Sequence, residues 1–315
     1  MTGGAGFIGS SFAKKAKQQG WDVTIFDNLS TGHKSTVDEL EKLGIRVIIG
    51  DIRDRDLLSK ETANCTAVVH LAAQVSVPLS VEKPEETNEI NVQGTDNVIQ
   101  SCFDNDVHRL VVASSAAVYG NADNLPLKEQ DAGQTLSPYA ESKWTNEQQI
   151  FSARNNGLKA TALRFFNVYG VGQRPDGAYA AVVPKFVEMM VNKQAPRING
   201  DGLHTRDFVH VNDVCNAIWS LIDGEWKAQA HHVYNVATQT KVTLLDLIAI
   251  INNSLTSEVP NFTPLIPTHG PERVGDIRHS MASIARITET IQWSPMVEFE
   301  QGIKELVLRQ LNSQS

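Results

Sequence analysis

The chain of 315 residues lacks the features that mark disulfide-bonded, membrane-spanning and metal-binding proteins. Its three cysteines, Cys65, Cys102 and Cys215, are far apart and form no CxxC pair, so we expect isolated thiols in a reducing compartment. No run approaches about 18 consecutive apolar residues, and the first residues show no basic start leading into an apolar stretch. The nine histidines form no HExxH motif and no cluster of ligand spacing, so we expect no metal site. The sequence therefore predicts a cytoplasmic protein with no membrane partner.

Positive charge is also scarce. Lys and Arg number 28 against 36 Asp and Glu, which gives a formal net charge of −8 and argues against nucleic acid as a partner. Repeats of 20 to 50 residues and low-complexity tracts are not found, which argues against a solenoid. What the chain has is ordinary globular composition, with 41% hydrophobic residues and enough length for a sizeable core.

Short apolar, β-branched runs alternate with helix-length amphipathic segments in the first half. This pattern is typical of an α/β fold, a Rossmann-like doubly wound parallel sheet covered by helices on both faces. The predicted strands are 23–26, 45–49, 67–71, 109–113 and 160–165. The predicted helices are 8–19, 54–62, 88–105, 139–156, 180–192, 211–223, 243–254 and 299–311. We expect a nucleotide-binding domain at 1–170 and a smaller C-terminal substrate-binding domain at 171–315, with the chain crossing back near 200–240.

The string TGGAGFIG at 2–9 places glycines at a three-residue spacing where a helix begins. Gly3, Gly6 and Gly9 allow a tight turn and a close approach of the backbone to a pyrophosphate, which the helix N-terminus then binds. Asp27 ends the next strand, where a carboxylate accepts the ribose hydroxyls and favours NAD over NADP. The alternatives are a glycine-rich loop without a ligand and a solvated turn aspartate.

Such a turn ordinarily follows a strand of about five residues, yet here it begins at Thr2. We therefore expect that the central first strand is missing from the N-terminus of this sequence and that a few apolar residues precede it.

Tyr139 and Lys143, in YAESK at 139–143, are four residues apart and so lie on one face of the predicted helix. An ammonium beside a phenol favours the phenolate and lowers its pKa, which suits a general base. Ser115, in SSAAVYG at 114–120, follows a predicted strand at the carboxyl edge where doubly wound sheets bind ligands. It is a candidate to hydrogen-bond the reacting hydroxyl. A chance Tyr/Lys spacing and a helix-capping serine remain the alternatives.

These motifs, together with FDNLSTG at 26–32, HLAA at 70–73, RFFNVYG at 164–170, GDGLHTRDFVHVNDV at 200–214 and RVGDIRHS at 273–280, resemble an extended short-chain dehydrogenase/reductase of the NAD-dependent nucleotide-sugar epimerase branch. The resemblance spans nearly the whole chain. It implies NAD contacts from Phe7, Ile8, Asp27, Asn28, Asp51, Ile52, Leu71, Ala72, Ala73, Asn91, Ser115, Tyr139, Lys143 and Phe166. For a UDP-sugar it implies contacts from Ser76, Asn167, Val182, Asn199, Arg206, Arg273, Asp276 and Ser280, with Arg206 and Arg273 on the diphosphate. It also implies a homodimer in which the helices at 88–105 and 139–156 form a four-helix bundle.

The residues after Ser115 indicate which reaction of this branch the chain performs. Similar dehydratases carry an Asp-Glu pair and similar decarboxylases a Glu, where this chain has Ala116 and Ala117. Methyl groups cannot act as general acid or base, so the sequence predicts C4 epimerisation through a transient 4-keto sugar, with Tyr139 as base. A dehydratase or decarboxylase and a non-catalytic NAD-binding sensor are the competing interpretations.

Ser280 resembles a family position where a bulky tyrosine restricts the pocket to plain hexoses. With the stretch at 176–182, the small side chain favours interconversion of UDP-GlcNAc and UDP-GalNAc. UDP-glucose and UDP-galactose remain candidates because an unfilled space discriminates weakly. A UDP-glucuronate 4-epimerase is a further alternative.

Overall fold

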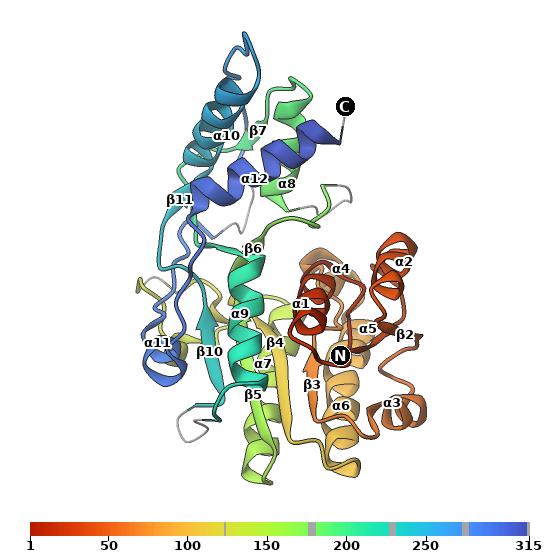
Figure 1. The fold of residues 1–315 in the computed structure, drawn as a ribbon. Coiled ribbons are helices and arrows are strands. Elements are labelled where there is room, and N and C mark those ends of the chain that lie inside the picture. Colours follow the sequence, from red (N-terminus) through yellow and green to blue (C-terminus); the bar gives the residue numbers. More distant parts are fainter. Residues whose placement is uncertain (123, 176–180, 227–230, 273–276, 314–315) are drawn as a thin grey trace.

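A parallel β-sheet organises the first two thirds of the chain in the computed structural model (Figure 1). The structure describes residues 1–122, 124–175, 181–226, 231–272 and 277–313. The strands of the sheet, in spatial order, are β2 (Arg46–Ile49), β1 (Thr24–Asp27), β3 (Ala67–His70), β4 (Arg109–Ser115), β5 (Lys159–Phe165) and β10 (Val233–Val236). The four pairs that these strands form, β1–β2, β3–β4, β4–β5 and β5–β10, are all parallel, which confirms the predicted doubly wound α/β fold.

Thr2 fills the position between β1 and β3. It forms parallel bridges with Phe26 on one side and His70 on the other. Its amide donates to the Val69 carbonyl over 3.0 Å, and the next amide, of Gly3, donates to the Phe26 carbonyl over 3.0 Å. Two ladders, β2-β1 and β3-β4-β5-β10, are thereby joined into one sheet just where the glycine-rich turn begins.

Helices cover both faces of this sheet. On one face lie α1 (Phe7–Gln18) and α9 (Val211–Ile222), whose apolar residues pack with Val111 and Leu163. On the other face lie α3 (Arg55–Thr62), α6 (Gly94–Asp104) and α7 (Pro138–Asn155), which pack with alternate residues of the same strands. The two faces have separate buried clusters because successive side chains of a strand point to opposite sides.

A second, smaller group of elements lies beyond the sheet, where Figure 1 shows α8, α10 and α12 together at the top. Its helices are α8 (Val182–Val191), α10 (Leu244–Glu258) and α12 (Phe299–Asn312), which share one apolar cluster. Three short strand pairs complete it: β6 (Asn167–Tyr169) with β9 (Phe208–His210), β7 (Arg197–Asn199) with β12 (Thr268–Gly270), and β8 (Thr205–Arg206) with β11 (Val242–Thr243).

Several elements differ from the sequence-based prediction. The predicted helix at 88–105 is interrupted, because a π-helical turn, η1 (Glu89–Gln93), separates α5 (Pro84–Asn88) from α6. The helices α2 (Lys34–Lys42), α4 (Val77–Glu82) and α11 (Ala285–Ile291) were not predicted. Two 3-10 turns, η2 (Ala116–Tyr119) and η3 (Glu129–Asp131), follow β4. Within the described residues, no helix is both long and apolar enough to cross a bilayer.

Candidate active site

The glycine-rich turn packs so tightly that three of its four glycines, Gly3, Gly4 and Gly9, have no room for a side chain. Gly3 has φ +69°, and a Cβ there would lie 2.5 Å from the Ala72 amide nitrogen. A Cβ on Gly9 would collide with the Gly3 carbonyl oxygen. Gly6 is different, since the nearest atom to its Cβ position is 3.4 Å away. Gly3 and Gly9 therefore fix the turn against β3 and α1, while Gly6 leaves open space beside the N-terminus of α1, as a bound pyrophosphate requires.

Asp27 ties the end of β1 to this turn. One carboxylate oxygen accepts from the Ala5 amide and the other from the Leu29 amide, both over 2.9 Å. The side chain is buried, at 8% exposure, and a carboxylate has further lone pairs for a ligand. The residues of the turn and Asp27 thus fit the phosphate and ribose groups of a dinucleotide.

Asp51 lies at the next strand end and is engaged by protein groups. The Arg53 guanidinium donates to both carboxylate oxygens, over 2.9 and 2.8 Å, and Asn28 donates to one of them over 3.0 Å. The Arg53 side chain holds the pKa of the Asp51 carboxyl well below its usual range. The neighbouring Ile52 points its side chain into the core below the sheet edge, against Gly94.

Ser115, Tyr139 and Lys143 are brought together where β4 ends against α7. Ser115 is the last residue of β4, and its hydroxyl accepts from the Ala117 amide over 3.2 Å. The same hydroxyl lies close enough to the Tyr139 phenol to lower its pKa. The Lys143 ammonium donates to the Ala113 carbonyl over 2.9 Å. Both Tyr139 and Lys143 are buried, at 9% and 4% exposure. The sequence signal of spacing and position therefore corresponds to one compact group of side chains.

Burial dominates the protonation of this group. It raises the pKa of Tyr139, and the hydrogen bond from Ser115 opposes that rise. It lowers the pKa of Lys143 to about 8, while the negative charge of Glu147 acts in the other direction. In the protein alone the net effect is a raised Tyr139 pKa, because desolvation of the phenolate is the largest effect. The lowering expected from the Lys143 ammonium stays a prediction.

Asn91 links the loop after β3 to the helix that carries Tyr139. Its amide nitrogen donates to the Gln74 carbonyl and to the Ser142 hydroxyl, each over 2.9 Å, and its amide oxygen accepts from the Gln74 amide over 2.8 Å. Asn91 is 1% exposed and lies in the π-helical turn η1. Leu71, Ala72 and Ala73, which come directly after β3, are half-buried beside it.

A histidine that the sequence analysis did not select completes this framework. His70 Nδ1 and Nε2 lie 2.7 Å from the Thr2 hydroxyl and 2.9 Å from the Thr95 hydroxyl. Thr95 donates its single hydroxyl proton to the Asn91 carbonyl over 2.6 Å, so the Nε2 of His70 must be the donor and its Nδ1 the acceptor. Burial lowers the pKa of His70 to about 3, with Lys143 adding to the effect. The chain of bonds fixes one neutral tautomer.

Phe7 and Ile8 open α1 and are half-buried against the apolar cluster between α1 and α9. Phe166 follows β5 and packs with Tyr119 at a centroid distance of 5.9 Å. Phe166 shares an apolar cluster with Leu127 and Ala282, so the segment after Ser280 lies against the loop that follows the Ser115 strand.

The residues expected on the substrate side occupy strand ends and loops of the second half. The side-chain amide of Asn167 donates to the Asp207 carbonyl over 3.0 Å, and the backbone amide of Ser280 donates to the Thr205 carbonyl over 3.1 Å. The other described members are Arg206 in β8, Asn199 at the end of β7, Val182 at the start of α8 and Ser76, which caps α4. Arg273 and Asp276, and the stretch 176–180, lie outside the described residues.

Asp207 holds these substrate-side segments together, although the sequence analysis did not select it. One carboxylate oxygen accepts from the amide and the hydroxyl of Thr238, each over 2.7 Å. The other accepts from the Gln239 amide over 3.0 Å and the Ala282 amide over 3.1 Å. Asp207 is fully buried and directly follows Arg206, so it positions Arg206 and Ser280 relative to each other. Its position in the motif at 200–214 was the available signal.

Within the part of the chain that the structure describes, no three His, Cys, Asp or Glu side chains come together as a possible metal site. Ser115, Tyr139 and Lys143 place a hydroxyl, a phenol and an ammonium at the end of β4.

Comparison with known proteins identifies one family, in which the relatives of this chain include 4-epimerases and a decarboxylase. The family model described as the NAD dependent epimerase/dehydratase family matches residues 1–237. A putative UDP-glucose 4-epimerase of Methanocaldococcus jannaschii is 36% identical over 310 residues, which cover 98% of this chain and 96% of the relative.

Two solved structures share the whole fold. A UDP-N-acetylglucosamine 4-epimerase from Methanobrevibacter ruminantium, in complex with UDP-N-acetylmuramic acid, superposes with a TM-score of 0.90 at 34% identity, covering 100% of this chain and 97% of that one. A UDP-glucose 4-epimerase of Thermus thermophilus, in complex with NAD, gives a TM-score of 0.85 at 30% identity, covering 100% and 98%.

Proposed function

The chain belongs to the NAD-dependent epimerase/dehydratase family, and from this we infer that it catalyses NAD-dependent epimerisation at C4 of a UDP-hexose. The observation that carries the proposal is the group Ser115, Tyr139 and Lys143 at the carboxyl end of β4, followed by two alanines. A base is present at this edge of the sheet, whereas Ala116 and Ala117 offer neither an acid nor a base for eliminating water or carbon dioxide.

Tyr139 acts as the general base and acid of the reaction. Its phenolate takes the proton of the C4 hydroxyl and returns it after the 4-keto sugar has turned its other face to the cofactor. Ser115 hydrogen-bonds the same hydroxyl and holds it beside the phenol. NAD, when bound, supplies the positive charge and the hydride acceptor that this oxidation and its reversal need. Lys143, charged below its pKa of about 8, supports the phenolate against the cost of burial.

The cofactor site comprises the residues around the glycine-rich turn and the strand ends beside it. Its members are Gly3, Gly6, Phe7, Ile8, Gly9, Asp27, Asn28, Asp51, Ile52, Leu71, Ala72, Ala73, Asn91 and Phe166. The lack of room for a Cβ at Gly3 and Gly9, and the room for one at Gly6, support this assignment. Because the cofactor is regenerated in each turnover, it stays bound and no net oxidation appears.

The UDP-sugar lies between the sheet edge and the second half of the chain. Its ligands are Ser76, Asn167, Val182, Asn199, Arg206, Arg273, Asp276 and Ser280, with the two arginines on the diphosphate. Ser280 is joined through Thr205 to the strand of Arg206, which supports a common pocket for sugar and diphosphate. UDP-GlcNAc and UDP-GalNAc are the preferred substrates, and UDP-glucose and UDP-galactose also react because a pocket for an acetamido group discriminates against a hydroxyl by only about 1 to 3 kcal/mol.

The protein works as a cytoplasmic homodimer. The resemblance to the family, in which the helices matching α6 and α7 pair between two copies, supports the dimer. Cys102 and Cys215 are buried, and burial raises the pKa of both thiols to about 12, which suits thiols kept reduced. Light scattering of the purified protein measures its mass, and a mass of one chain would contradict the dimer.

The decisive experiment is incubation of the purified holoenzyme with UDP-GlcNAc and with UDP-glucose separately, without added NAD, followed by resolution of the C4 isomers. We expect both to equilibrate with their epimers. Tyr139→Phe should lower kcat by about 10²- to 10⁴-fold, the usual contribution of a general acid–base group. Tyr234→Phe, which removes the hydroxyl of another buried tyrosine in β10, is the matched control and should react near the wild-type rate. Wild-type activity in Tyr139→Phe would rule out the mechanism.

A separate variant tests the substrate preference. Ser280→Tyr places a bulky ring in the proposed acetamido space and should lower kcat/KM for UDP-GlcNAc more than for UDP-glucose. Equal losses on both sugars would remove Ser280 from the specificity argument.

A further inference from the structure

Glu147 is a fully buried carboxylate on the helix that carries Tyr139 and Lys143. It lies four residues after Lys143 and so on the same face of α7. The Arg164 guanidinium of β5 donates to its two oxygens, over 2.8 and 2.7 Å, and the Ser114 hydroxyl donates to one of them over 2.5 Å. Ser114 directly precedes Ser115, so the carboxylate is fixed directly beneath the catalytic group.

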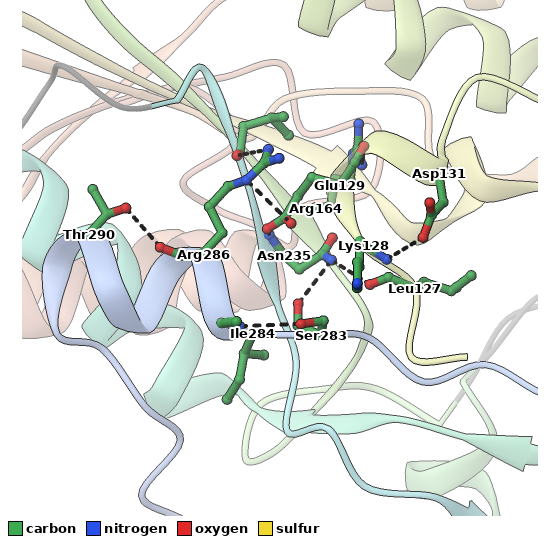
Figure 2. A network of polar contacts seen from close by, with 12 residues as sticks. Leu127, Lys128, Glu129, Asp131, Arg164, Asn235, Ser283, Ile284, Arg286 and Thr290 are labelled. Atoms are coloured by element: carbon green, nitrogen blue, oxygen red, sulfur yellow. Dashed lines mark hydrogen bonds and ion pairs between the residues drawn. The ribbon is translucent and has the colours of Figure 1, made fainter. Parts of the chain in front are cut away.

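The guanidinium is itself held from its other side. Nη1 of Arg164 donates to the Tyr119 hydroxyl over 2.9 Å and to the Glu129 carbonyl over 2.8 Å. Figure 2 shows Arg164 beside Glu129, with Asn235 and Arg286 completing the network. The Asn235 amide donates to the Glu129 carboxylate over 3.0 Å, and Arg286 lies 3.5 Å from its other oxygen. Because both its donors are fixed, the Glu147 carboxylate has one position.

Lys143 has little else to keep it charged. Its ammonium donates to the Ala113 carbonyl of β4, and burial lowers its pKa to about 8 while Glu147 raises it. His70, facing it from β3, is neutral because burial lowers its pKa to about 3. Burial raises the pKa of Tyr139 on α7, so its phenol is neutral in the protein alone, and the Arg164 cation is paired with the Glu147 carboxylate over 2.7 Å. The negative end of the Glu147–Arg164 pair is therefore the one that acts on Lys143.

We propose that Glu147 is a positioning residue that keeps the Lys143 ammonium protonated at the pH where Tyr139 works, with Arg164 and Ser114 orienting its carboxylate. The inference rests on the proposed roles of Tyr139 and Lys143. It goes beyond a packing role, because a buried ion pair can be replaced without loss of the fold, whereas the charge beside Lys143 cannot be replaced by shape alone.

The test is the pH dependence of kcat/KM for the holoenzyme in which Glu147→Gln removes the charge and keeps the size. The alkaline limb, set by loss of the Lys143 proton, should move to lower pH by about one unit, because the variant removes the negative charge that raises the Lys143 pKa. Glu129→Gln is the matched control. It makes the same chemical change in the same buried network, on the other side of Arg164, and should leave the limb in place even if the melting temperature falls.

A second readout does not need turnover. In protein labelled with ¹³Cε-lysine, the Lys143 resonance, assigned by its loss in Lys143→Arg, gives the pKa directly. We expect it to fall by about one unit in Glu147→Gln and to stay unchanged in Glu129→Gln. The two proposals can fail separately. If the wild type epimerises no UDP-sugar, yet the Lys143 pKa falls in Glu147→Gln, the proposed function fails and the electrostatic role of Glu147 stands.

An unmoved Lys143 pKa in Glu147→Gln, or an equal shift in Glu129→Gln, would overturn the proposal. If Glu147→Gln leaves Arg164 unpaired and does not fold, the double variant Glu147→Gln/Arg164→Gln removes both charges and keeps two hydrogen-bonding amides. The Lys143 pKa should then fall in the same direction, by less, since the distant cation is also removed.

Discussion

The glycine-rich turn and the segment around Asp207 hold their neighbours in opposite ways. At the turn, backbone packs directly on backbone: Gly3 donates to the Phe26 carbonyl and lies against Ala72 with no space for a Cβ. At Asp207, a side-chain carboxylate joins the segments by accepting four hydrogen bonds from two parts of the chain that are distant in sequence. The cofactor side is therefore sensitive to added atoms, and the substrate side is sensitive to the removal of one carboxylate.

Asp213, six residues after Asp207, also joins segments through a buried carboxylate. It is fully buried, and its carboxylate oxygens accept from the Met296 amide over 3.0 Å and the Val297 amide over 3.1 Å. Asp213 thus anchors the segment that leads into α12. Two aspartates of one motif, at 200–214, connect most of the C-terminal segments to the body of the protein.

The largest effect should come from Asp207→Ala. Four donors lose their acceptor in a buried place, at about 1 to 3 kcal/mol each, and water entering the space recovers part of this. We expect the free energy of unfolding to fall by about 4 kcal/mol, measured by urea titration. The KM for the UDP-sugar should rise more than the NAD affinity falls, because Arg206 and Ser280 lose their common anchor. A loss below about 1 kcal/mol would contradict the role of Asp207 as an anchor.

On the cofactor side, Gly3→Ala should cost about 3 kcal/mol of unfolding free energy. The left-handed backbone at φ +69° costs about 1 to 2 kcal/mol for a residue with a Cβ, and the contact with the Ala72 amide adds an overpacking cost of similar size. Thermal unfolding of the protein stripped of NAD measures it.

Gly6→Ala is the control for that variant. Its Cβ has 3.4 Å to the nearest atom, so the stripped protein should unfold near the wild-type temperature, yet retain less NAD because the Cβ lies where the pyrophosphate approaches. Equal destabilisation by Gly3→Ala and Gly6→Ala would mean that the two positions do not differ in the space that they leave for a Cβ.

Asp213→Ala should cost about half as much as Asp207→Ala, about 2 kcal/mol, because two amides rather than four donors lose their acceptor. The same urea titration measures it. The KM for the UDP-sugar should not change, since Asp213 anchors the segment before α12 and not Arg206 or Ser280. A rise in KM equal to that of Asp207→Ala would show that the two aspartates are not separate anchors.

Sequence patterns identified the parts of the protein that depend on local or repeated signals. Strands β1 to β5 were predicted within two residues at each end, because strands buried on both faces are continuous apolar runs. Strand β10 is not a continuous apolar run, because Asn235, which is unfavourable in strands, interrupts it. The Asn235 side chain donates to the Leu127 and Ser283 carbonyls. The polar helix α2, with two buried residues, gave no clear apolar stripe.

The same distinction applies to the site. Ser115, Tyr139, Lys143 and the glycines were predicted from motifs with fixed spacing, and the structure places the three side chains together. Asp207 and Glu147 were not predicted as functional residues. Their partners are backbone amides up to 75 residues away and a guanidinium on another element, and such partners leave no periodic trace in the sequence.

The smallest expected effect concerns His70, which lies between the turn and η1. Its pKa is about 3 in the folded protein, against an ordinary 6.5, so the unfolded chain binds more protons between these values. Stability should therefore fall as the pH drops below 6.5, by about 1.4 kcal/mol for each pH unit, until pH 3. His70→Gln keeps an acceptor for Thr2 and a donor for Thr95 without a titrating group. Urea titrations at pH 5.5 and 4.5 should show a loss smaller by about 1 kcal/mol in the variant. Identical pH dependence in both proteins would mean that the fold does not lower the His70 pKa and that Nδ1 can take up a proton beside Thr2.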